Sequence, residues 1–348
     1  MSARVPGPPS SIYVGRVAMI TPVGLTAPAS CAAMRAGISR LQDLTIFHPD
    51  REPLIGAYVE AADFADAEIH VHLLASCLQE LTADWQVDRI AESGWFFGLS
   101  EPGRVGRPAR IDRWLVPELE RRLGWSLPPN RVWIVQAGRT SVLRAVAAAR
   151  KLLAERAVRR CVIAGVESDV DETSVAELYK TRRLKTTENP DGLYPGEAAA
   201  AVEILSSPSG SAADVRITGL GFGMEPHPIG AVQPCRADGL TAAVRSALAE
   251  ARLDFADLDG RISDVTGEQY YFREAGLVVS RLLRQHKDGF PLWHSADAIG
   301  DVGAAVGAVL LGVAATALQK GYAPGPNLIC QTGADSGTRA VAIVQAGA

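Results

Sequence analysis

The sequence predicts an α/β protein in which two similar halves form two mixed, mostly parallel sheets around shared central helices. Strand-like and helix-like segments alternate along the chain, an order typical of parallel sheets covered by helices. The same series of segments occurs on both sides of the polar stretch 206–211. The helix-like segments 141–154 and 302–318 have little polar face, as expected of helices enclosed between two sheets.

The first half opens with a strand over residues 12–20, which ends in a Thr-Pro-Val-Gly turn. A helix is predicted over 30–36, with Ser30 as its N-cap. Residues 215–221 repeat the strand and its Gly-rich turn, so we expect Val17 and Val215 to be related by a pseudo-twofold axis.

Three later segments of the first half also have counterparts in the second half. We therefore expect a flexible segment at 1–11, an N-terminal half at 12–208 and a C-terminal half at 212–348. The paired segments are 131–135 with 291–293, 141–154 with 302–318, and 160–165 with 327–333.

Composition limits the classes of function. The net charge of −4 gives no reason to expect nucleic acid or an anionic membrane as a partner. The most apolar stretch, 302–318, is shorter than the roughly 20 residues of a spanning helix. The first residues lack the apolar core of a signal peptide, so we expect a cytoplasmic protein with no membrane segment.

The cysteines are five in number and widely spaced, and no Cys-x-x-Cys pair is present. This pattern favours reduced thiols over a disulfide framework or a zinc site. We expect no metal and no cofactor. The cysteines are Cys31, Cys77, Cys161, Cys235 and Cys330.

Four segments, taken together and in order, resemble the β-ketoacyl synthases of the thiolase superfamily. VAMITPVGLT at 17–26 resembles the opening strand and turn of that family. NPDGLYPGEAAAAVEIL at 189–205 resembles its Arg-Asp-Gly-Phe-x-x-Gly-Glu-Gly-Ala loop and the strand after it. IGDVGAAVGAV at 299–309 and GADSGTRAVAIV at 333–344 resemble its Gly-His turn and its closing turn. The resemblance implies a duplicated thiolase-like α-β-α-β-α sandwich, and a dimer formed through the strand 131–135.

The resemblance also implies a site for Claisen condensation, which needs a cysteine thiolate at a helix N-terminus. The nucleophile turn matches residues 136–141, where the family has Ala-Cys and this chain has Ala137, Gly138 and Arg139. No register of the turn supplies a cysteine. If Arg139 points into the cavity, its buried charge needs a partner, for which Asp301 or Glu268 is a candidate.

The residues that assist decarboxylation in the family are replaced as well. Thr266 and Asp301 take the positions of the two histidines, and Ala296 takes that of the lysine. We therefore expect no retained catalytic residue. The side chains expected to line the former cavity are Gln136, Glu268, His294, Ala334 and Asp335.

Other chemistry remains open at three places. Cys330 lies near the position of a second thiolase cysteine, but a buried structural role fits its spacing better. His294, Ser295 and Asp297 could form a triad only if the fold arranged them so. A cation could bind Glu268, Glu274 and Asp301, although the usual ligand spacing is absent.

Several polar segments are more simply explained as solvated surface. His70 and His72 could bind metal on a strand, but a solvated pair is the simpler interpretation. Residues 264–271, with Tyr270 and Tyr271, are expected to form a solvated loop with aromatic anchors. The basic run 180–185 could meet an acidic acyl carrier protein, and a solvated loop is the alternative.

These losses favour a catalytically silent ketosynthase-like subunit that acts through binding. It could pair with itself or with an active ketosynthase, as chain-length factors do. Some chain-length factors carry Gln in place of the cysteine, and Gln136 lies close to that position without matching it exactly. It could instead be an adaptor of the kind that accompanies type VI secretion effectors. The alternative is an acyltransferase or 3-oxoacyl synthase with a non-standard nucleophile.

Overall fold

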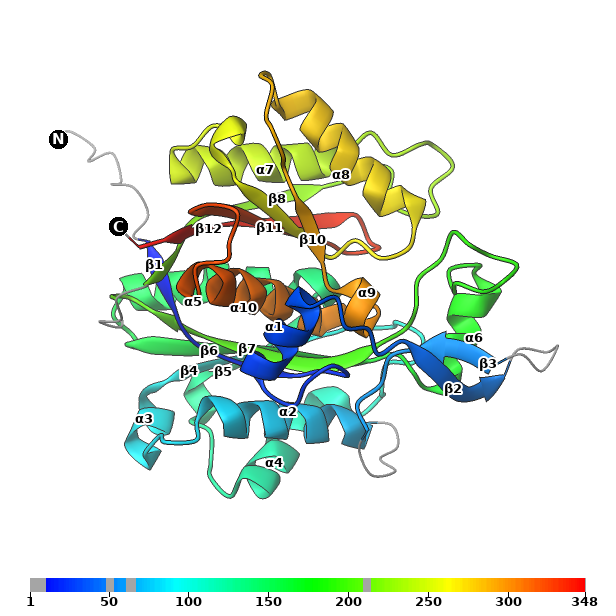
Figure 1. Cartoon of the computed structure of the whole chain (residues 1–348). Helices are drawn as coiled ribbons and strands as arrows, with labels where there is room; N and C mark the ends of the chain where they lie inside the picture. Colours follow the sequence, from blue (N-terminus) through cyan, green and yellow to red (C-terminus); the bar gives the residue numbers. More distant parts are fainter. Residues whose placement is uncertain (1–10, 48–52, 61–66, 209–213, 348) are drawn as a thin grey trace.

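The computed structural model describes residues 11–47, 53–60, 67–208 and 214–347, and ten of its strands form two five-stranded layers (Figure 1). The layers are joined at one end, where the first strand of each half pairs over three residues. The lower layer contains β1 (Ile12–Ile20), β4 (Gly94–Leu99), β5 (Val132–Gln136), β6 (Arg160–Ser168) and β7 (Glu197–Leu205). The upper layer contains β8 (Val215–Met224), β9 (Gly260–Ser263), β10 (Leu292–His294), β11 (Asn327–Gly333) and β12 (Thr338–Ala346).

The two layers have the same topology. The strand order is β5-β4-β6-β7-β1 in the lower layer and β10-β9-β11-β12-β8 in the upper one. The first two pairings in each order are parallel and the last two are antiparallel. One strand in each layer therefore runs antiparallel to the other four: β7 in the lower layer and β12 in the upper layer. This repeat confirms the duplicated thiolase-like sandwich with mixed, mostly parallel sheets.

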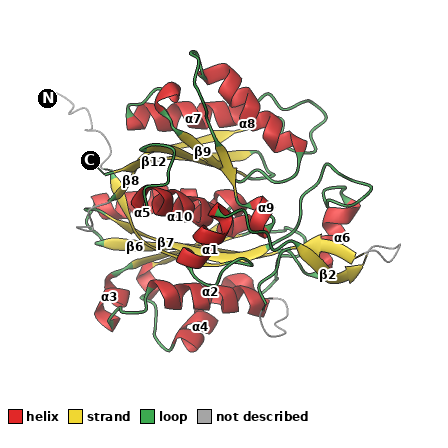
Figure 2. Cartoon of the chain, viewed as in Figure 1, coloured by secondary structure: helices red, strands yellow, loops and turns green. Residues whose placement is uncertain are grey.

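Helices cover both outer faces and fill the space between the layers (Figures 1 and 2). The lower face carries α2 (Ala67–Leu81), α3 (Val87–Glu92) and α4 (Ile111–Leu123), and the upper face carries α7 (Asp238–Ala251) and α8 (Gln269–Leu282). Between the layers lie α1 (Ala27–Arg35), α5 (Ser141–Ala154) and α10 (Val306–Gln319). The shorter elements are β2 (Gln42–Phe47), β3 (Pro53–Gly56), α6 (Glu172–Lys180), α9 (Ala296–Ile299), η1 (Pro129–Arg131), η2 (Gly138–Thr140), η3 (Phe255–Asp257) and η4 (Gly303–Ala305).

The central helices are buried because small residues let them approach both sheets. In α10, ten of its fourteen residues are buried, most of them Gly, Ala, Val or Leu. Gly165 of β6 shows the close approach, since a Cβ there would lie 2.2 Å from the carbonyl oxygen of Ala304. This packing holds the starts of α5 and α10 side by side, which is where the candidate site forms.

Two local predictions are wrong. The first helix begins at Ala27 rather than near Ser30, because the side chain of Thr26 accepts a hydrogen bond from the N–H of Ala29 (3.3 Å) and caps it. Ser30 is buried within that helix, and its hydroxyl is hydrogen-bonded to that of Thr21 at 2.8 Å.

The histidine pair His70 and His72 lies on the helix α2, not on a strand. His70 is buried and its Nε2 lies 3.6 Å from the Glu167 carboxylate, so the expectation of a solvated pair is also wrong. The alternating Glu-Ile-His-Val-His segment is too short to distinguish the period of a strand from that of a helix.

The division of the chain into 12–208 and 212–348 remains a proposal, because 209–213 lies outside the described residues. The proposed flexible segment 1–11 likewise falls almost wholly outside them. Among the residues described, none of the helices is long and apolar enough to cross a membrane.

Candidate functional site

Two glycine turns meet at the starts of the central helices. Gly138 in η2 has φ +50° and Gly303 in η4 has φ +43°, both in the left-handed region that favours glycine. A Cβ at Gly138 would lie 2.4 Å from both carboxylate oxygens of Glu101. The position that resembles the family's nucleophile is therefore built for a residue without a side chain.

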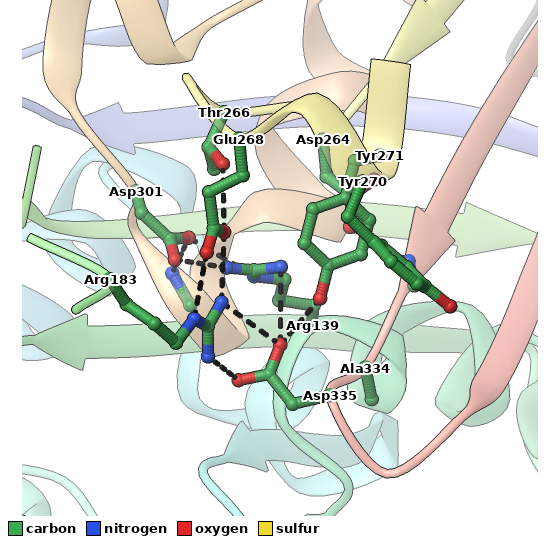
Figure 3. Close-up of polar contacts among 12 residues, drawn as sticks. Arg139, Arg183, Asp264, Thr266, Glu268, Tyr270, Tyr271, Asp301, Ala334 and Asp335 are labelled. Carbon is green, nitrogen blue, oxygen red and sulfur yellow. Dashed lines mark hydrogen bonds and ion pairs between the residues drawn. The ribbon is translucent and has the colours of Figure 1, made fainter. Parts of the chain in front are cut away.

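Arg139 points into the space between the two turns (Figure 3). Its side chain is only 7% exposed and makes a two-point ion pair with Asp301, in which Nε donates to Oδ1 at 3.2 Å and Nη2 meets Oδ2. Its guanidinium carbon also lies 5.1 Å from the ring centre of Tyr271, within cation–π range. The expected Arg139–Asp301 pair is thus present.

A second arginine extends this network. Arg183 binds both carboxylate oxygens of Glu268 at 2.8 Å and also pairs with Asp335 (Figure 3). Asp335 in turn accepts a hydrogen bond from the hydroxyl of Tyr271 (2.5 Å) and lies 3.6 Å from Arg139. Burial acts to raise the pKa of Asp335, but the two arginines hold it well below its usual range.

A third arginine also lines the cavity. Nη1 of Arg104 lies 3.1 Å from the Glu167 carboxylate, and its Nη2 bonds to Asp169. Burial raises the pKa of Asp169 to about 7, although Arg104 favours its charged form. The site as a whole is an interlocked set of charges contributed by both halves of the chain.

These side chains leave a cavity of only about 30 Å³. That is the volume occupied by about one water molecule, far less than an acyl thioester requires. The lining residues are Glu101, Arg104, Gly138, Arg139, Glu167, Asp169, Leu178, Arg183, Leu193, Asp301, Gly303, Ala334 and Asp335.

The predicted site residues divide into three groups. Gly138, Arg139, Asp301, Ala334 and Asp335 line the cavity. Glu268 and Thr266 lie beside it, where the Thr266 hydroxyl donates to Glu268 at 3.2 Å. The remaining three, Gln136, Ala296 and His294, are not among the lining residues.

Gln136 is exposed and donates to Asp112 at 2.5 Å. His294 lines a different cavity, of about 390 Å³, and its Nε2 lies 3.5 Å from Asp297. Its Nδ1 has no hydrogen-bond partner among the described residues, so His294, Ser295 and Asp297 do not form a triad.

The cysteines are poor candidates for a replacement nucleophile. All five are buried. Burial raises the pKa of Cys161 to about 12 and that of Cys330 higher still, and Sγ of Cys330 faces the carbonyl oxygen of Leu310 (3.7 Å) rather than the cavity. The structural role expected for Cys330 fits this burial.

Potential metal ligands gather away from the cavity. Glu225, Cys235 and Glu274 place ligand atoms within 4.8 Å of one another. However, Nε of Arg339 lies 2.9 Å from both carboxylate oxygens of Glu274 and already supplies a positive charge. The predicted carboxylate set does not assemble either, because Glu268 and Asp301 pair with different arginines and Glu274 pairs with Arg339.

Sequence reasoning missed the roles of Arg183 and Arg104, and it placed residues 264–271 in solvent. The prediction of a solvated basic loop is wrong for Arg183, whose side chain is 19% exposed. Asp264, Glu268 and Tyr271 are buried rather than solvated. No signal within one sequence pairs Arg183 with Glu268, because the two are 85 residues apart.

Asp264 provides a pH test of this network. Burial raises its pKa to about 6, although Arg139 and the N–H of Gly333 favour the ionised form. Because this value lies above that of an unfolded chain, the group's contribution to stability is complete below about pH 4 and is lost as the pH rises to about 6. Asp264→Asn should remove that loss. Between pH 4 and 7 the free energy of unfolding should therefore fall by on the order of 2 kcal/mol more in the wild type than in the variant.

Denaturant unfolding at both pH values measures the difference. The exposed Asp43→Asn is the control and should show the wild-type pH dependence. If Asp264→Asn also follows the wild type, the carboxyl is not held in the environment described.

The fold and the position of the site define a protein with the thiolase-like architecture of the β-ketoacyl synthases. No family model matches the chain, and a search of curated proteins finds no match. The solved structures do match. A chain of the ketosynthase–chain length factor complex from Xenorhabdus doucetiae has a TM-score of 0.77 at 15% identity, covering 97% of this chain and 98% of that one.

Two further structures agree. The ishigamide ketosynthase/chain length factor gives a TM-score of 0.77 at 16% identity, covering 97% of this chain and 99% of the other. A β-ketoacyl synthase from Burkholderia phymatum gives 0.74 at 16% identity, covering 97% and 100%. At these identities the likeness establishes the fold over nearly the whole chain.

Proposed function

We propose that this protein is a catalytically silent β-ketoacyl synthase-like subunit that acts through binding, in the manner of a chain-length factor. The observation that carries the proposal is the Arg139–Asp301 ion pair, which occupies the place where the related fold would hold an acyl thioester. The fold matches over 97% of this chain, whereas the site is closed by charges that pair with one another.

The partner we propose is a ketosynthase-like subunit, either a second copy of this chain or an active relative. Among the similar structures are a ketosynthase with its chain length factor and a type II polyketide acyl-carrier protein in complex with its ketosynthase. An acyl carrier protein is therefore a second candidate partner. The basic run 180–185 is less suited to it than the sequence suggested, because Arg183 is held within the site.

The edge strand β5 supports the pairing. It forms one end of the lower layer, and four consecutive apolar residues, 132–135, are partly exposed along it. An unpaired apolar strand edge is a liability that association removes. We infer that two subunits pair along this edge.

Ile134→Lys is expected to convert a dimer into monomers, or to unfold it, because the ammonium group would be buried at the joined edge. Val87→Lys is the control. Val87 is 71% exposed on α3, so this substitution adds the same charge away from the proposed interface. Analytical ultracentrifugation measures the change. A native protein that sediments as a monomer at micromolar concentration, alone and with a candidate ketosynthase partner, would contradict the pairing.

The test of catalytic silence is intact-mass spectrometry after incubation with acyl-CoA or acyl-carrier protein. No stable acyl adduct is expected, because the described cysteines are buried and the cavity holds about one water. A stable adduct on Cys330 or any other side chain would favour the alternative, an acyltransferase or 3-oxoacyl synthase with a non-standard nucleophile.

The accessory role in type VI secretion is a second proposal about the partner, carried by the sequence resemblance alone. Genomic neighbours distinguish the two. An adjacent intact ketosynthase and acyl carrier protein would favour the chain-length-factor role, and adjacent secretion genes would favour the adaptor role.

A further inference from the structure

A large arginine-lined groove lies at the opposite end of α5 from the closed site. The site lies at the N-terminus of this 14-residue helix, and the groove begins just past its C-terminus, roughly 20 Å away. The groove has a volume of about 1010 Å³. Five arginines line it: Arg16, Arg89, Arg156, Arg159 and Arg160.

The groove carries excess positive charge in a chain that is negative overall. Among the described residues, Glu203 is the only acidic one that lines the groove. It is buried and accepts hydrogen bonds from Nη2 of Arg89 (2.8 Å) and Nη1 of Arg160 (3.2 Å). Arg16 pairs with Asp84 (2.7 Å) at its margin. Five guanidinium groups therefore face two carboxylates, which leaves an excess of three positive charges.

Two of the arginines are fixed in place before any ligand binds. Besides their bonds to Glu203, Arg89 and Arg160 lie over the indole ring of Trp85, at 4.3 and 5.7 Å from its centre. Guanidinium groups held in this way lose little freedom on binding, which strengthens binding to an anion. They form the ordered floor of the groove.

Two of the remaining three arginines supply charge that no carboxylate neutralises. Arg156 and Arg159 lie in the turn between α5 and β6, and both are exposed. Neither side chain has an ion pair or hydrogen bond among the described residues. Their planar donors suit the oxygens of a phosphate group, which guanidinium binds in a two-point manner.

The lining disfavours a macromolecule as the occupant. Protein partners are usually held by exposed apolar anchors, but the apolar side chains of Leu153 and Val158 in the groove are buried. Single-stranded nucleic acid needs exposed aromatic rings for stacking, and Trp85 is buried beneath the arginines. The volume is that of a pocket for a small molecule.

We propose that this groove binds a small molecule that carries two or more phosphate groups. The ordered pair Arg89 and Arg160 would orient one phosphate, while Arg156 and Arg159 would neutralise the next. The inference is independent of the proposed ketosynthase-like pairing, because the groove shares no residue with the closed site or with β5.

Isothermal titration of the full-length protein with inorganic tripolyphosphate tests the proposal. Saturable one-to-one binding is expected, tighter than that of single phosphate. Arg156→Gln/Arg159→Gln should weaken it by tenfold or more, since two charge-assisted contacts to phosphate are lost. Arg245→Gln, an exposed arginine on α7, is the matched control and should leave the affinity unchanged.

A second experiment, binding to vesicles that contain a phosphoinositide, distinguishes a lipid headgroup from a free metabolite as the source of the phosphates. Binding of both probes, lost in the double variant, would indicate a lipid headgroup, and binding of tripolyphosphate alone a free phosphorylated metabolite. The proposal is overturned if tripolyphosphate does not saturate, if the double variant binds as tightly as wild type, or if a polyglutamate peptide binds as tightly as tripolyphosphate.

Discussion

Arg139→Met is expected to lower the free energy of unfolding by about 3–5 kcal/mol, the usual cost of removing one partner from a buried ion pair. The variant leaves Asp301 buried at 7% exposure, with Arg139 no longer opposite it. It also removes one of the two arginines that favour the charged form of Asp335. The loss should appear in denaturant unfolding near neutral pH, where both carboxylates are opposed by arginine in the wild type.

A double variant shows whether the charge itself causes the loss. Arg139→Met/Asp301→Asn removes both charges, while the amide oxygen can still accept from the N–H of Gly303, a bond of 3.1 Å in the wild type. The double variant should therefore be more stable than Arg139→Met alone.

The control is Arg121→Met, which removes an exposed partner of Glu118. It should lower stability far less than Arg139→Met does, because solvent screens an exposed ion pair. If Arg139→Met were as mild as this control, the ion pair would not be holding the cavity closed, and the proposal of a silent subunit would lose its main support.

Much of the fold could be predicted because its signals are local. The strand at 12–20 coincides with β1, and the helix at 141–154 coincides with α5, since periodicity and turn residues act over a few positions. The duplication could be inferred because the same local patterns occur twice. The first helix was misplaced by three residues because Thr26 and Ser30 are both good caps. Thr26 is the one that caps the helix, whereas the Ser30 hydroxyl donates to the carbonyl oxygen of Gly24.

The site could be predicted only in part, because its charges are paired over long distances in sequence. The Arg139–Asp301 pair was among the candidates because the resemblance placed both residues in one cavity, although they are 162 residues apart. Arg104 and Arg183 lie outside the motifs of that resemblance. The carboxylates that pair with Arg104 lie in its own half but more than 60 residues further along the chain, and Glu268, which pairs with Arg183, lies in the other half.

Gly138→Cys is expected to leave the protein unable to condense a malonyl extender, although it supplies the missing thiol. The cysteine backbone would have to keep the φ of +50° that Gly138 has, and its Cβ would lie 2.4 Å from the carboxylate oxygens of Glu101. Backbone strain of this kind costs about 1–3 kcal/mol. A thiol next to a carboxylate is also a poor nucleophile, because the negative charge opposes formation of the thiolate.

A second variant distinguishes the effect of backbone strain on condensation from the effect of the missing catalytic groups. Gly138→Cys/Glu101→Ala removes the clash and the nearby charge, so it should regain part of the stability and can become acylated at the new cysteine. It should still not condense, because Thr266 and Asp301 stand where the resemblance places imidazoles. A carboxylate at Asp301 would repel the developing enolate rather than stabilise it.

Product formation from an acyl donor and a malonyl extender measures the outcome, with intact mass reporting whether the cysteine is acylated. Condensation by the wild-type protein alone would refute catalytic silence. Condensation by either cysteine variant would show that Thr266 and Asp301 do not occupy the histidine positions. Acylation without condensation is the expected result, since each missing group costs orders of magnitude in rate and restoring one does not replace the others.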